Sequence, residues 1–111
     1  MNMKGRTALI TGATGGLGQH MAETIAELGG RGVLIDRPGS DYTPLTSRLH
    51  QYGTEVFCID CDLESEDERK QLITEVNEQF LSIDVLINNA AFVGTTDLSG
   101  WITSFEEQEI G

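Results

Sequence analysis

The stretch TALITGATGGLG, residues 7–18, decides the fold of this chain. Its first part, 7–11, is a short apolar run of the kind that forms a buried strand, and its second part, 12–18, is a glycine-rich turn. Beyond the turn, apolar residues recur at helical spacing until Gly29-Gly30 end the pattern; they are Leu17, Met21, Ile25 and Leu28. A strand that enters a helix through such a turn predicts the start of a βαβ unit.

The rest of the chain continues this alternation. Apolar runs predict strands at 32–35, 55–59 and 84–87, and helical spacing predicts helices at 43–53 and 65–80. Right-handed crossovers then predict an α/β fold, a Rossmann-like doubly wound parallel sheet with the strand order 3-2-1-4. We expect a single partial domain, 1–111, truncated before the later strands of such a sheet.

Capping signals support the helix positions. Pro44 is expected in a first turn, and Ser65 with Glu68 has the spacing of a capping box. Ser104 with Glu107 repeats that spacing, so a further helix is expected to begin there. The inner faces of the second and third helices are expected to be formed by Leu45, Leu49 and Tyr52, and by Leu72, Ile73, Val76 and Phe80.

The composition excludes several classes of function. Its 39% hydrophobic and 23% charged residues are typical of a globular protein. The formal net charge of −11 would repel phosphate backbones and anionic lipids, so we expect no nucleic acid and no membrane among the partners. No apolar run near the N-terminus is as long as a signal-peptide core, so we expect a cytoplasmic protein.

Cys58 and Cys61 have a C-x-x-C spacing that could indicate a redox pair or half of a zinc site. No second such pair follows, and His20 and His50 are isolated. We therefore expect buried or half-buried thiols at a strand end, and no metal site.

The glycine turn is a candidate anion site. Backbone N–H groups between Gly12 and Gly18 meet the positive end of a helix dipole there, which suits a pyrophosphate. A Cβ would block the ligand or the positive φ of the turn. A merely flexible turn is the alternative, but a position after a strand and before a helix favours dinucleotide binding. No Lys-Ser or Lys-Thr follows, which excludes a P-loop.

An acidic residue is expected some 20 positions after such a turn, and Asp36 stands there, at the end of the second strand. Its carboxylate can accept hydrogen bonds from ribose hydroxyls and would repel a 2′-phosphate, so NAD is favoured over NADP. Arg37 could instead pair with that phosphate, and Asp36 could simply cap a loop.

At these residues the sequence resembles the short-chain dehydrogenase/reductase family, and the resemblance covers essentially the whole chain. The pattern 11–18 is similar to the family's cofactor signature, and Asp62-Leu63 to its adenine-contacting pair. The run 88–91, Asn-Asn-Ala-Ala, resembles the family's Asn-Asn-Ala-Gly motif, which ties the sheet and lines the cofactor ribose. The dinucleotide site expected on these grounds comprises Gly12, Thr14, Gly15, Gly16, Leu17, Gly18, Asp36, Arg37, Asp62, Leu63, Asn89 and Ala90.

The resemblance implies hydride transfer between a nicotinamide and an alcohol or carbonyl in the complete enzyme, carried by a Ser, a Tyr and a Lys. Neither Tyr42 nor Tyr52 is followed four residues later by Lys. We therefore assign no catalytic residue and expect no turnover by this chain alone. A non-catalytic NAD-sensing or interaction module is the alternative. The glycine spacing 12-15-18 also fits a fragment of the family's extended branch, the sugar-nucleotide epimerases and dehydratases, although the two asparagines favour the classical branch.

The last predicted strand would present an unpaired apolar edge, Val85-Leu86-Ile87, because such a strand is interior in the full family fold. We expect self-association through this edge. The aromatic and apolar residues that follow in the last predicted loop are Trp101, Ile102 and Phe105. They could contact a substrate, but packing against another part of the protein is favoured.

Overall fold

Two strands form a centre that is buried on both faces. In the computed structural model, which describes residues 2–80 and 82–90, every residue of β1 (Thr7–Thr11) is buried, as are the four middle residues of β2 (Arg31–Asp36). Side chains alternate between the two faces of a strand, so a strand whose consecutive residues are all buried must be covered on both sides.

All four strands run parallel in the order β3-β2-β1-β4, as predicted. The outer strands are β3 (Val56–Asp60) and β4 (Val85–Asn88). Thr11, at the end of β1, is in register with Ile35 and Asn88 on its two neighbours. The carboxyl ends of the strands therefore meet along one edge of the sheet, where open α/β sheets bind ligands.

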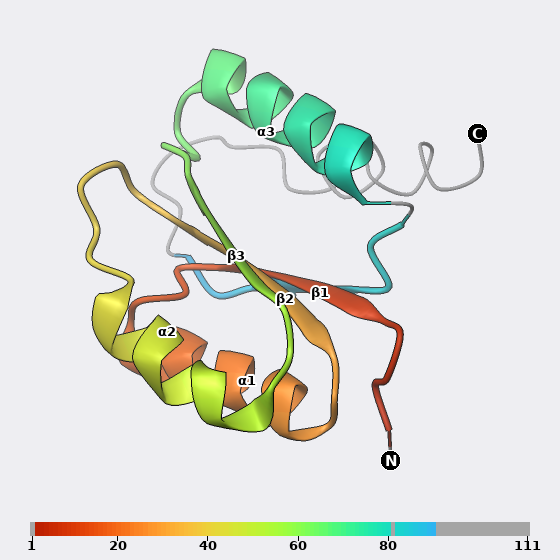
Figure 1. Cartoon of the computed structure of the whole chain (residues 1–111). Helices are drawn as coiled ribbons and strands as arrows, with labels where there is room; N and C mark the ends of the chain where they lie inside the picture. The colour runs from red at the N-terminus through yellow and green to blue at the C-terminus, as the bar shows by residue number, and fades with distance from the viewer. Residues whose placement is uncertain (1, 81, 91–111) are drawn as a thin grey trace.

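In the described part of the chain, three α-helices cover the sheet. Figure 1 shows α1 (Gly16–Glu27) and α2 (Thr43–Leu49) on one face and α3 (Glu66–Gln79) on the other. One core cluster joins Leu9 and Val33 to residues of α3, and the other joins Ile10 and Leu34 to residues of α1 and α2. The helical side chains of these clusters are Leu72 and Val76 of α3, Ala22, Ile25 and Ala26 of α1, and Leu45 and Leu49 of α2.

The buried face of α1 differs from the one that its large apolar residues suggest. Leu17 is 58% exposed and Met21 37% exposed, although both fit the helical spacing. Small residues face the sheet instead, among them Gly18 and Ala22. The reason is close packing at the start of the helix, where even a Cβ on Gly18 would overlap the Gly12 carbonyl oxygen. Further along the helix Ile25 is buried, as its spacing predicted.

The second predicted helix divides in two. After α2, the chain continues as a 3-10 turn, His50–Tyr52, and stops at Gly53, whose left-handed φ of 70° ends the helical region. Tyr52 is only partly buried, whereas Leu45 and Leu49 are buried as predicted. The predicted helix that begins at Ser104 lies outside the described residues.

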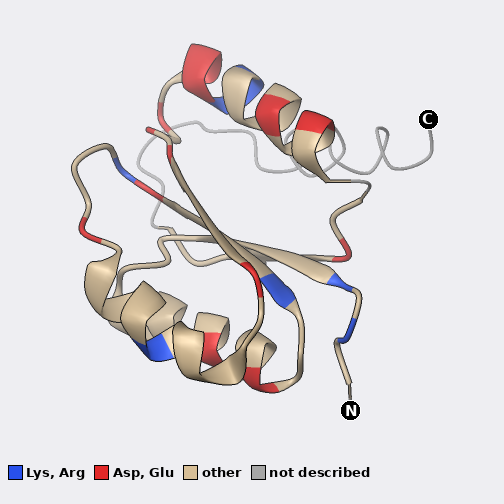
Figure 2. Ribbon diagram, viewed as in Figure 1, with Lys and Arg blue, Asp and Glu red and all other residues tan. Residues whose placement is uncertain are grey.

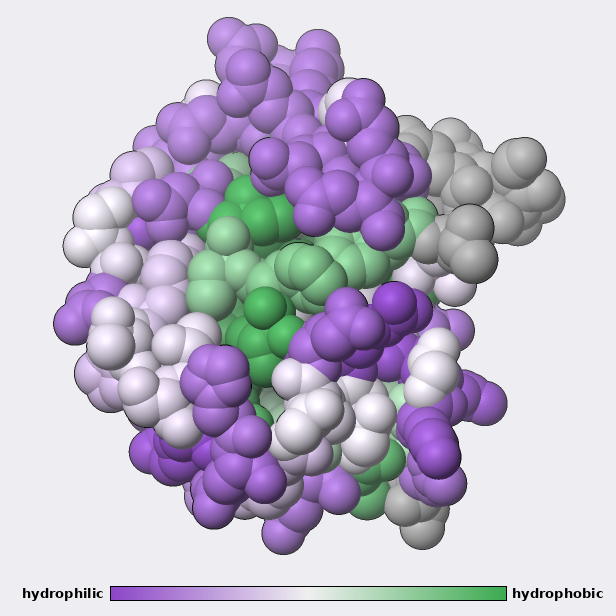
Figure 3. All heavy atoms as spheres, in the orientation of Figure 1, coloured by the Kyte–Doolittle hydropathy of each residue, from purple (hydrophilic) through white to green (hydrophobic). Residues whose placement is uncertain are grey.

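The prediction that both thiols are at least half-buried is wrong for one of them. Cys61 is buried, but Cys58 is exposed within β3 rather than at its end. An edge strand has a neighbour on one side only, so its side chains retain contact with solvent. Figure 3 shows an apolar band on the surface across the middle of the molecule, where β3 runs in Figure 1.

The surface of α3 is strongly polar. Its sequence EDERKQLITEVNEQ carries three acidic residues in the first turn alone, and Figure 2 shows red segments at both ends of this helix. Within residues 2–80 and 82–90, no helix is long and apolar enough to cross a membrane.

Two glycines of the turn are required by close backbone contacts. Gly12 has a φ of 63°, and a Cβ there would lie 3.0 Å from the Ala90 nitrogen. A Cβ on Gly18 would overlap the Gly12 carbonyl oxygen and lie 2.9 Å from Ala13 Cα. Gly16 differs from both, because a Cβ there meets nothing within 4 Å.

This contrast predicts opposite outcomes for one substitution at two positions. Gly18→Ala should lower the free energy of unfolding by about 2 kcal/mol or more, since the backbone itself must move. Gly16→Ala should leave it unchanged or raise it by up to about 1 kcal/mol, because alanine favours the helix. Urea unfolding of both variants checks this, and equal stability losses would contradict the packing described here.

Candidate functional site

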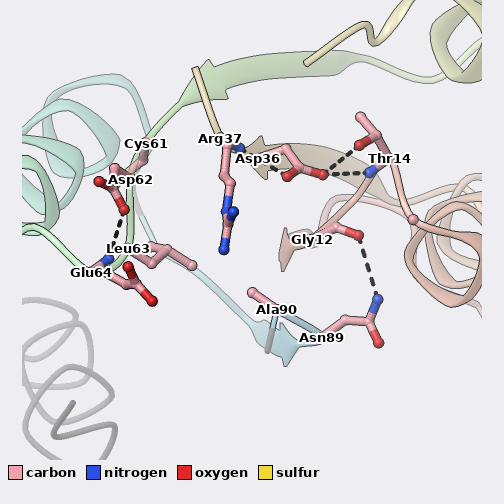
Figure 4. Close-up of a pocket in the computed structure, with 11 residues that line it drawn as sticks. Gly12, Thr14, Asp36, Arg37, Cys61, Asp62, Leu63, Glu64, Asn89 and Ala90 are labelled. Carbon is pink, nitrogen blue, oxygen red and sulfur yellow. Dashed lines mark hydrogen bonds between the residues drawn. The ribbon is translucent and has the colours of Figure 1, made fainter. Parts of the chain in front are cut away.

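One cavity of about 310 Å³ lies at the carboxyl ends of all four strands. It is lined from the end of β1 by Gly12, Thr14 and Gly15, from β2 by Asp36 and Arg37, from β3 by Cys61, Asp62, Leu63 and Glu64, and from β4 by Asn89 and Ala90. Figure 4 shows these side chains arranged around the cavity. Four chain segments that are distant in sequence thus contribute to one site.

The start of α1 forms one side of the site and has no cap of its own. Its N-cap residue, Gly15, has no side chain to offer, and the first turn contains no acidic residue. The start of α3 is different, because the Ser65 hydroxyl accepts a hydrogen bond from the Glu68 nitrogen and three acidic residues follow Ser65. The positive end of the α1 dipole is therefore available to an anion, whereas that of α3 is already neutralised.

Asp36 is held in a fixed orientation at the edge of the cavity. Its Oδ2 accepts hydrogen bonds from the Thr14 nitrogen at 2.9 Å and from the Thr14 hydroxyl at 2.6 Å. Its Oδ1 accepts one from the Arg37 nitrogen at 2.8 Å. Burial raises the pKa of Asp36, but these hydrogen bonds and the Arg37 charge outweigh it, so the pKa lies below its ordinary value. The carboxyl group is therefore ionised at neutral pH.

Arg37 provides a positive charge in the same cavity. The residue is exposed, and Figure 4 shows its side chain directed across the cavity between Asp36 and the Asp62–Glu64 segment. Among the described residues, its guanidinium has no hydrogen-bond or ion-pair partner. An anionic group of a ligand could therefore bind there without displacing a protein contact.

The β3 side of the site is fixed from α3. The Asp62 nitrogen donates to Glu68 Oε1 at 2.9 Å, and Arg69 donates to the Leu63 carbonyl at 2.6 Å. The predicted capping box is thus only half formed, because the Glu68 carboxylate binds Asp62 and not the N-cap residue Ser65. The Asp62 side-chain carboxylate accepts a hydrogen bond from the Glu64 backbone nitrogen at 3.0 Å.

The β4 side is fixed by Thr11. Its hydroxyl donates to Asn88 Oδ1 at 2.8 Å and accepts from the nitrogens of Asn89 at 3.1 Å and Ala90 at 3.2 Å. The Asn89 side chain also donates to the Gly12 carbonyl at 3.4 Å. The end of β4 is therefore tied to the end of β1, as the Asn-Asn-Ala motif suggested.

The structure brings most of the predicted site residues together. Three of them, Gly16, Leu17 and Gly18, do not line the cavity: Gly16 and Leu17 are exposed and Gly18 is buried under the turn. Sequence reasoning missed Cys61 and Glu64, which do line it. Their position on either side of Asp62-Leu63 was an available signal. Burial, followed by the nearby Glu68 and Asp62 charges, raises the pKa of Cys61 to about 11, so this thiol is protonated at neutral pH.

Tyr42 has a structural role. Its hydroxyl donates to the Ile59 carbonyl at 3.2 Å, and it does not line the cavity. Burial first, and then the adjacent Asp60 carboxylate, raise the pKa of Tyr42. A tyrosine that served as a general base would require the opposite shift.

Comparison with known proteins points to one family. Residues 6–109 match the family model described as short chain dehydrogenase. A 3-oxoacyl-(acyl-carrier-protein) reductase of Staphylococcus epidermidis is 38% identical over 87 residues, which are 77% of this chain and 35% of the relative. The rhamnolipids biosynthesis 3-oxoacyl-(acyl-carrier-protein) reductase of Pseudomonas aeruginosa is 32% identical, over 90% of this chain and 41% of the relative.

Solved structures agree. An NADPH-dependent 3-quinuclidinone reductase from Rhodotorula rubra superposes with a TM-score of 0.72 at 32% identity, covering 88% of this chain and 38% of that one. The Pseudomonas aeruginosa RhlG/NADP active-site complex superposes with a TM-score of 0.74 at 29% identity, covering 98% of this chain and 46% of that one. The chain thus spans less than half the length of each of these proteins.

The hydrogen bonds to Asp36 predict a pH-dependent effect of Thr14→Val. The low pKa of Asp36 in the folded state means that its carboxylate adds stability above the unfolded value of about 4, and that this is lost as the pH falls through the folded pKa. The variant should lose about 1 kcal/mol at pH 7, and the loss should shrink towards pH 2.5.

The control for this measurement is Thr14→Ser, which keeps the hydroxyl and should keep most of the stability. Urea unfolding at the two pH values checks both variants. A loss that is the same for serine and valine, or the same at both pH values, would show that the hydroxyl does not stabilise the ionised carboxylate.

Proposed function

The chain belongs to the short-chain dehydrogenase family, and we propose that it forms the NAD-binding portion of an oxidoreductase of that family. One observation carries this proposal: the uncapped start of α1 and the ionised Asp36 carboxylate border the same cavity. A dinucleotide requires both features, a cationic place for its diphosphate and an acceptor for its ribose hydroxyls.

The residues fit such a ligand. The backbone N–H groups of Gly16 and Leu17 would hold the diphosphate, since the side chain of Leu17 is exposed to solvent. Gly15, whose own N–H donates to the Gly12 carbonyl, would leave room for the diphosphate because it has no Cβ. Gly12 and Gly18 would serve by allowing the turn to form. Asp36 would accept from the adenine ribose, with Arg37 beside it. The proposed contacts to the adenine come from Asp62 and Leu63, and those to the second ribose from Asn89 and Ala90.

A bound nicotinamide would accept or supply the hydride. The substrate class that we propose for the complete enzyme is a small alcohol or carbonyl compound, because the two curated relatives described above are named as reductases of 3-oxoacyl groups. This sequence offers neither a Tyr-x-x-x-Lys pair nor another residue set for that reaction. The role that we propose for the chain is therefore to hold and orient the cofactor.

We propose NAD as the preferred cofactor. If the adenine ribose binds at Asp36, a 2′-phosphate would lie close to the Asp36 carboxylate, and two like charges a few ångströms apart repel each other. Two similar solved structures carry NADP or NADPH in their names, and Arg37 offers a charge that such a phosphate could use. The preference for NAD over NADP thus depends on whether repulsion by the Asp36 carboxylate or attraction by the Arg37 guanidinium is stronger at the 2′-position.

Titration with both dinucleotides tests this proposal. The chain should bind NAD more tightly than NADP, and Asp36→Ala should weaken NAD binding about ten-fold or more, since it removes charge-assisted hydrogen bonds. NADP binding should be unchanged or improved in that variant, and Arg37→Gln should weaken NADP selectively.

Asp67→Ala is the matched control, because Asp67 is an exposed carboxylate on the first turn of α3 that does not line the cavity. It should bind both cofactors as the unmodified chain does. Isothermal titration calorimetry measures the dissociation constants of NAD and NADP for the unmodified chain and for each of the three variants. Indifference of NAD binding to Asp36→Ala would remove the ribose assignment, and no binding of either cofactor would remove the proposed function.

We also propose that the edge of β4 pairs with a second copy of the chain. Val85, Leu86 and Ile87 are partly exposed, and β4 is an outer strand of the described sheet. The mass measured by light scattering should therefore rise with concentration. Val85→Lys should reduce this rise, because lysine on an edge strand opposes pairing. Cys58→Lys, on the opposite edge of the sheet, should leave this rise unchanged. A monomer at all concentrations would overturn the pairing.

A further inference from the structure

Gln19 lies outside the cavity, yet it is connected to it. The residue belongs to the first turns of α1 and does not line the site. Its side-chain nitrogen donates to the Thr14 carbonyl oxygen at 2.7 Å. Thr14 in turn donates its backbone nitrogen and its hydroxyl to Asp36. Thr14 therefore connects the two residues, because its carbonyl is bound by Gln19 and its nitrogen and hydroxyl bind Asp36.

The other end of the Gln19 amide is bound as well. Its oxygen accepts a hydrogen bond from Arg48 Nη2 at 2.7 Å, and Arg48 Nε forms an ion pair with Glu23 at 3.0 Å. A carbonyl needs a donor and a guanidinium needs an acceptor, so the amide can satisfy both neighbours in one orientation only. Arg48 and Thr14 together fix the position of Gln19.

These contacts close a ring through the structure. Asp36 ends β2, and the chain then passes through an exposed loop into α2, which carries Arg48. From Arg48 the hydrogen bonds lead through Gln19 and Thr14 back to Asp36. The segment 36–48 is thus attached to the glycine turn directly at Asp36 and, through Gln19, at Arg48. A movement of α2 relative to α1 would therefore be transmitted to the Asp36 carboxylate through these hydrogen bonds.

We propose that Gln19, held by Arg48, is a positioning residue that fixes Thr14 so that Thr14 presents the Asp36 carboxylate to a ribose. The inference rests on the proposed function, since it concerns recognition of a dinucleotide by Asp36. It assigns control of cofactor affinity, and of the preference for a 2′-hydroxyl over a 2′-phosphate, to two residues that the nucleotide does not touch.

The physical reason is the geometry of one residue. Gln19 holds the peptide group between Thr14 and Gly15, whose other hydrogen bond, from the Gly15 nitrogen to the Gly12 carbonyl, is the longer one at 3.2 Å. Without Gln19 this peptide group is held less firmly, so Thr14 can shift, and its nitrogen and hydroxyl shift relative to Asp36. Asp36 then loses part of the contacts that lower its pKa and aim it at the cavity. NAD binding uses that carboxylate and should suffer. NADP binding, which relies on a cation in its place, should not suffer to the same degree.

Gln19→Met tests the proposal, because methionine keeps the length of the side chain and removes both hydrogen bonds. We expect the dissociation constant for NAD to rise about five-fold and that for NADP to change less than two-fold. The pKa of the Asp36 carboxyl group, measured in the ligand-free protein by carbon-13 NMR and assigned with Asp36→Asn, should rise towards its ordinary value. A merely structural role for Gln19 would not move this pKa.

Gln71→Met is the matched control. It makes the same change at an exposed glutamine of α3 that has no hydrogen bond to another described side chain. Both dissociation constants and the Asp36 pKa should remain those of the unmodified chain. Thermal unfolding of each variant verifies that the fold is intact.

Arg48→Met separates the chain of contacts from a local effect. Alone, it should raise the dissociation constant for NAD about two-fold; combined with Gln19→Met, it should add nothing, because Arg48 acts through Gln19. If Gln19→Met folds poorly, Arg48→Met carries the same readouts.

The outcomes are distinguishable. If the unmodified chain binds neither NAD nor NADP, the proposed function fails. If it binds NAD, and the folded Gln19→Met protein keeps both the affinity and the Asp36 pKa, the positioning role is refuted. Multiplicative effects of the two substitutions would refute the path through Gln19.

Discussion

The structure depends on a contact between backbone atoms around Gly12. Its carbonyl oxygen accepts a hydrogen bond from the Gly15 nitrogen at 3.2 Å and lies against the α-carbon of Gly18, while its own α-carbon lies against Ala90. One peptide group thus joins the end of β1, the start of α1 and the end of β4. Side chains at these positions would separate the three segments, and the cavity between them would lose its shape.

The site combines opposite charges within an acidic protein. A diphosphate is an anion, and the chain carries a formal net charge of −11. To bind a diphosphate, the dipole at the start of α1 must outweigh the repulsion from the negative charge of the whole protein. A carboxylate in the first turn would weaken this dipole, and α1 begins without one whereas α3 begins with three. Asp36 is the exception inside the cavity, and its hydrogen bonds to Thr14 offset the cost of keeping that charge beside an anionic ligand.

The residues on three sides of the cavity are each held by hydrogen bonds to a neighbouring side chain. Thr11 holds Asn89 and Ala90, Glu68 holds Asp62, and Thr14 holds Asp36. Such an arrangement orients the groups before a ligand arrives, so less conformational entropy is lost on binding. The same logic extends one step further at Asp36, where Gln19 and Arg48 stand behind Thr14.

The sequence by itself determined the strand order, the place of the glycine turn and the acidic residue at the end of β2. The last two follow from local patterns, because hydrophobic period and glycine position act on neighbouring residues. The strand order follows from the sequence of predicted strands and helices once right-handed crossovers connect them. Only the tertiary structure decided which face of α1 is buried, that Cys58 is exposed, that Glu68 binds Asp62, and that Gln19 joins Arg48 to Thr14. These features depend on distances between segments far apart in the chain, and such distances are set by how closely the layers pack.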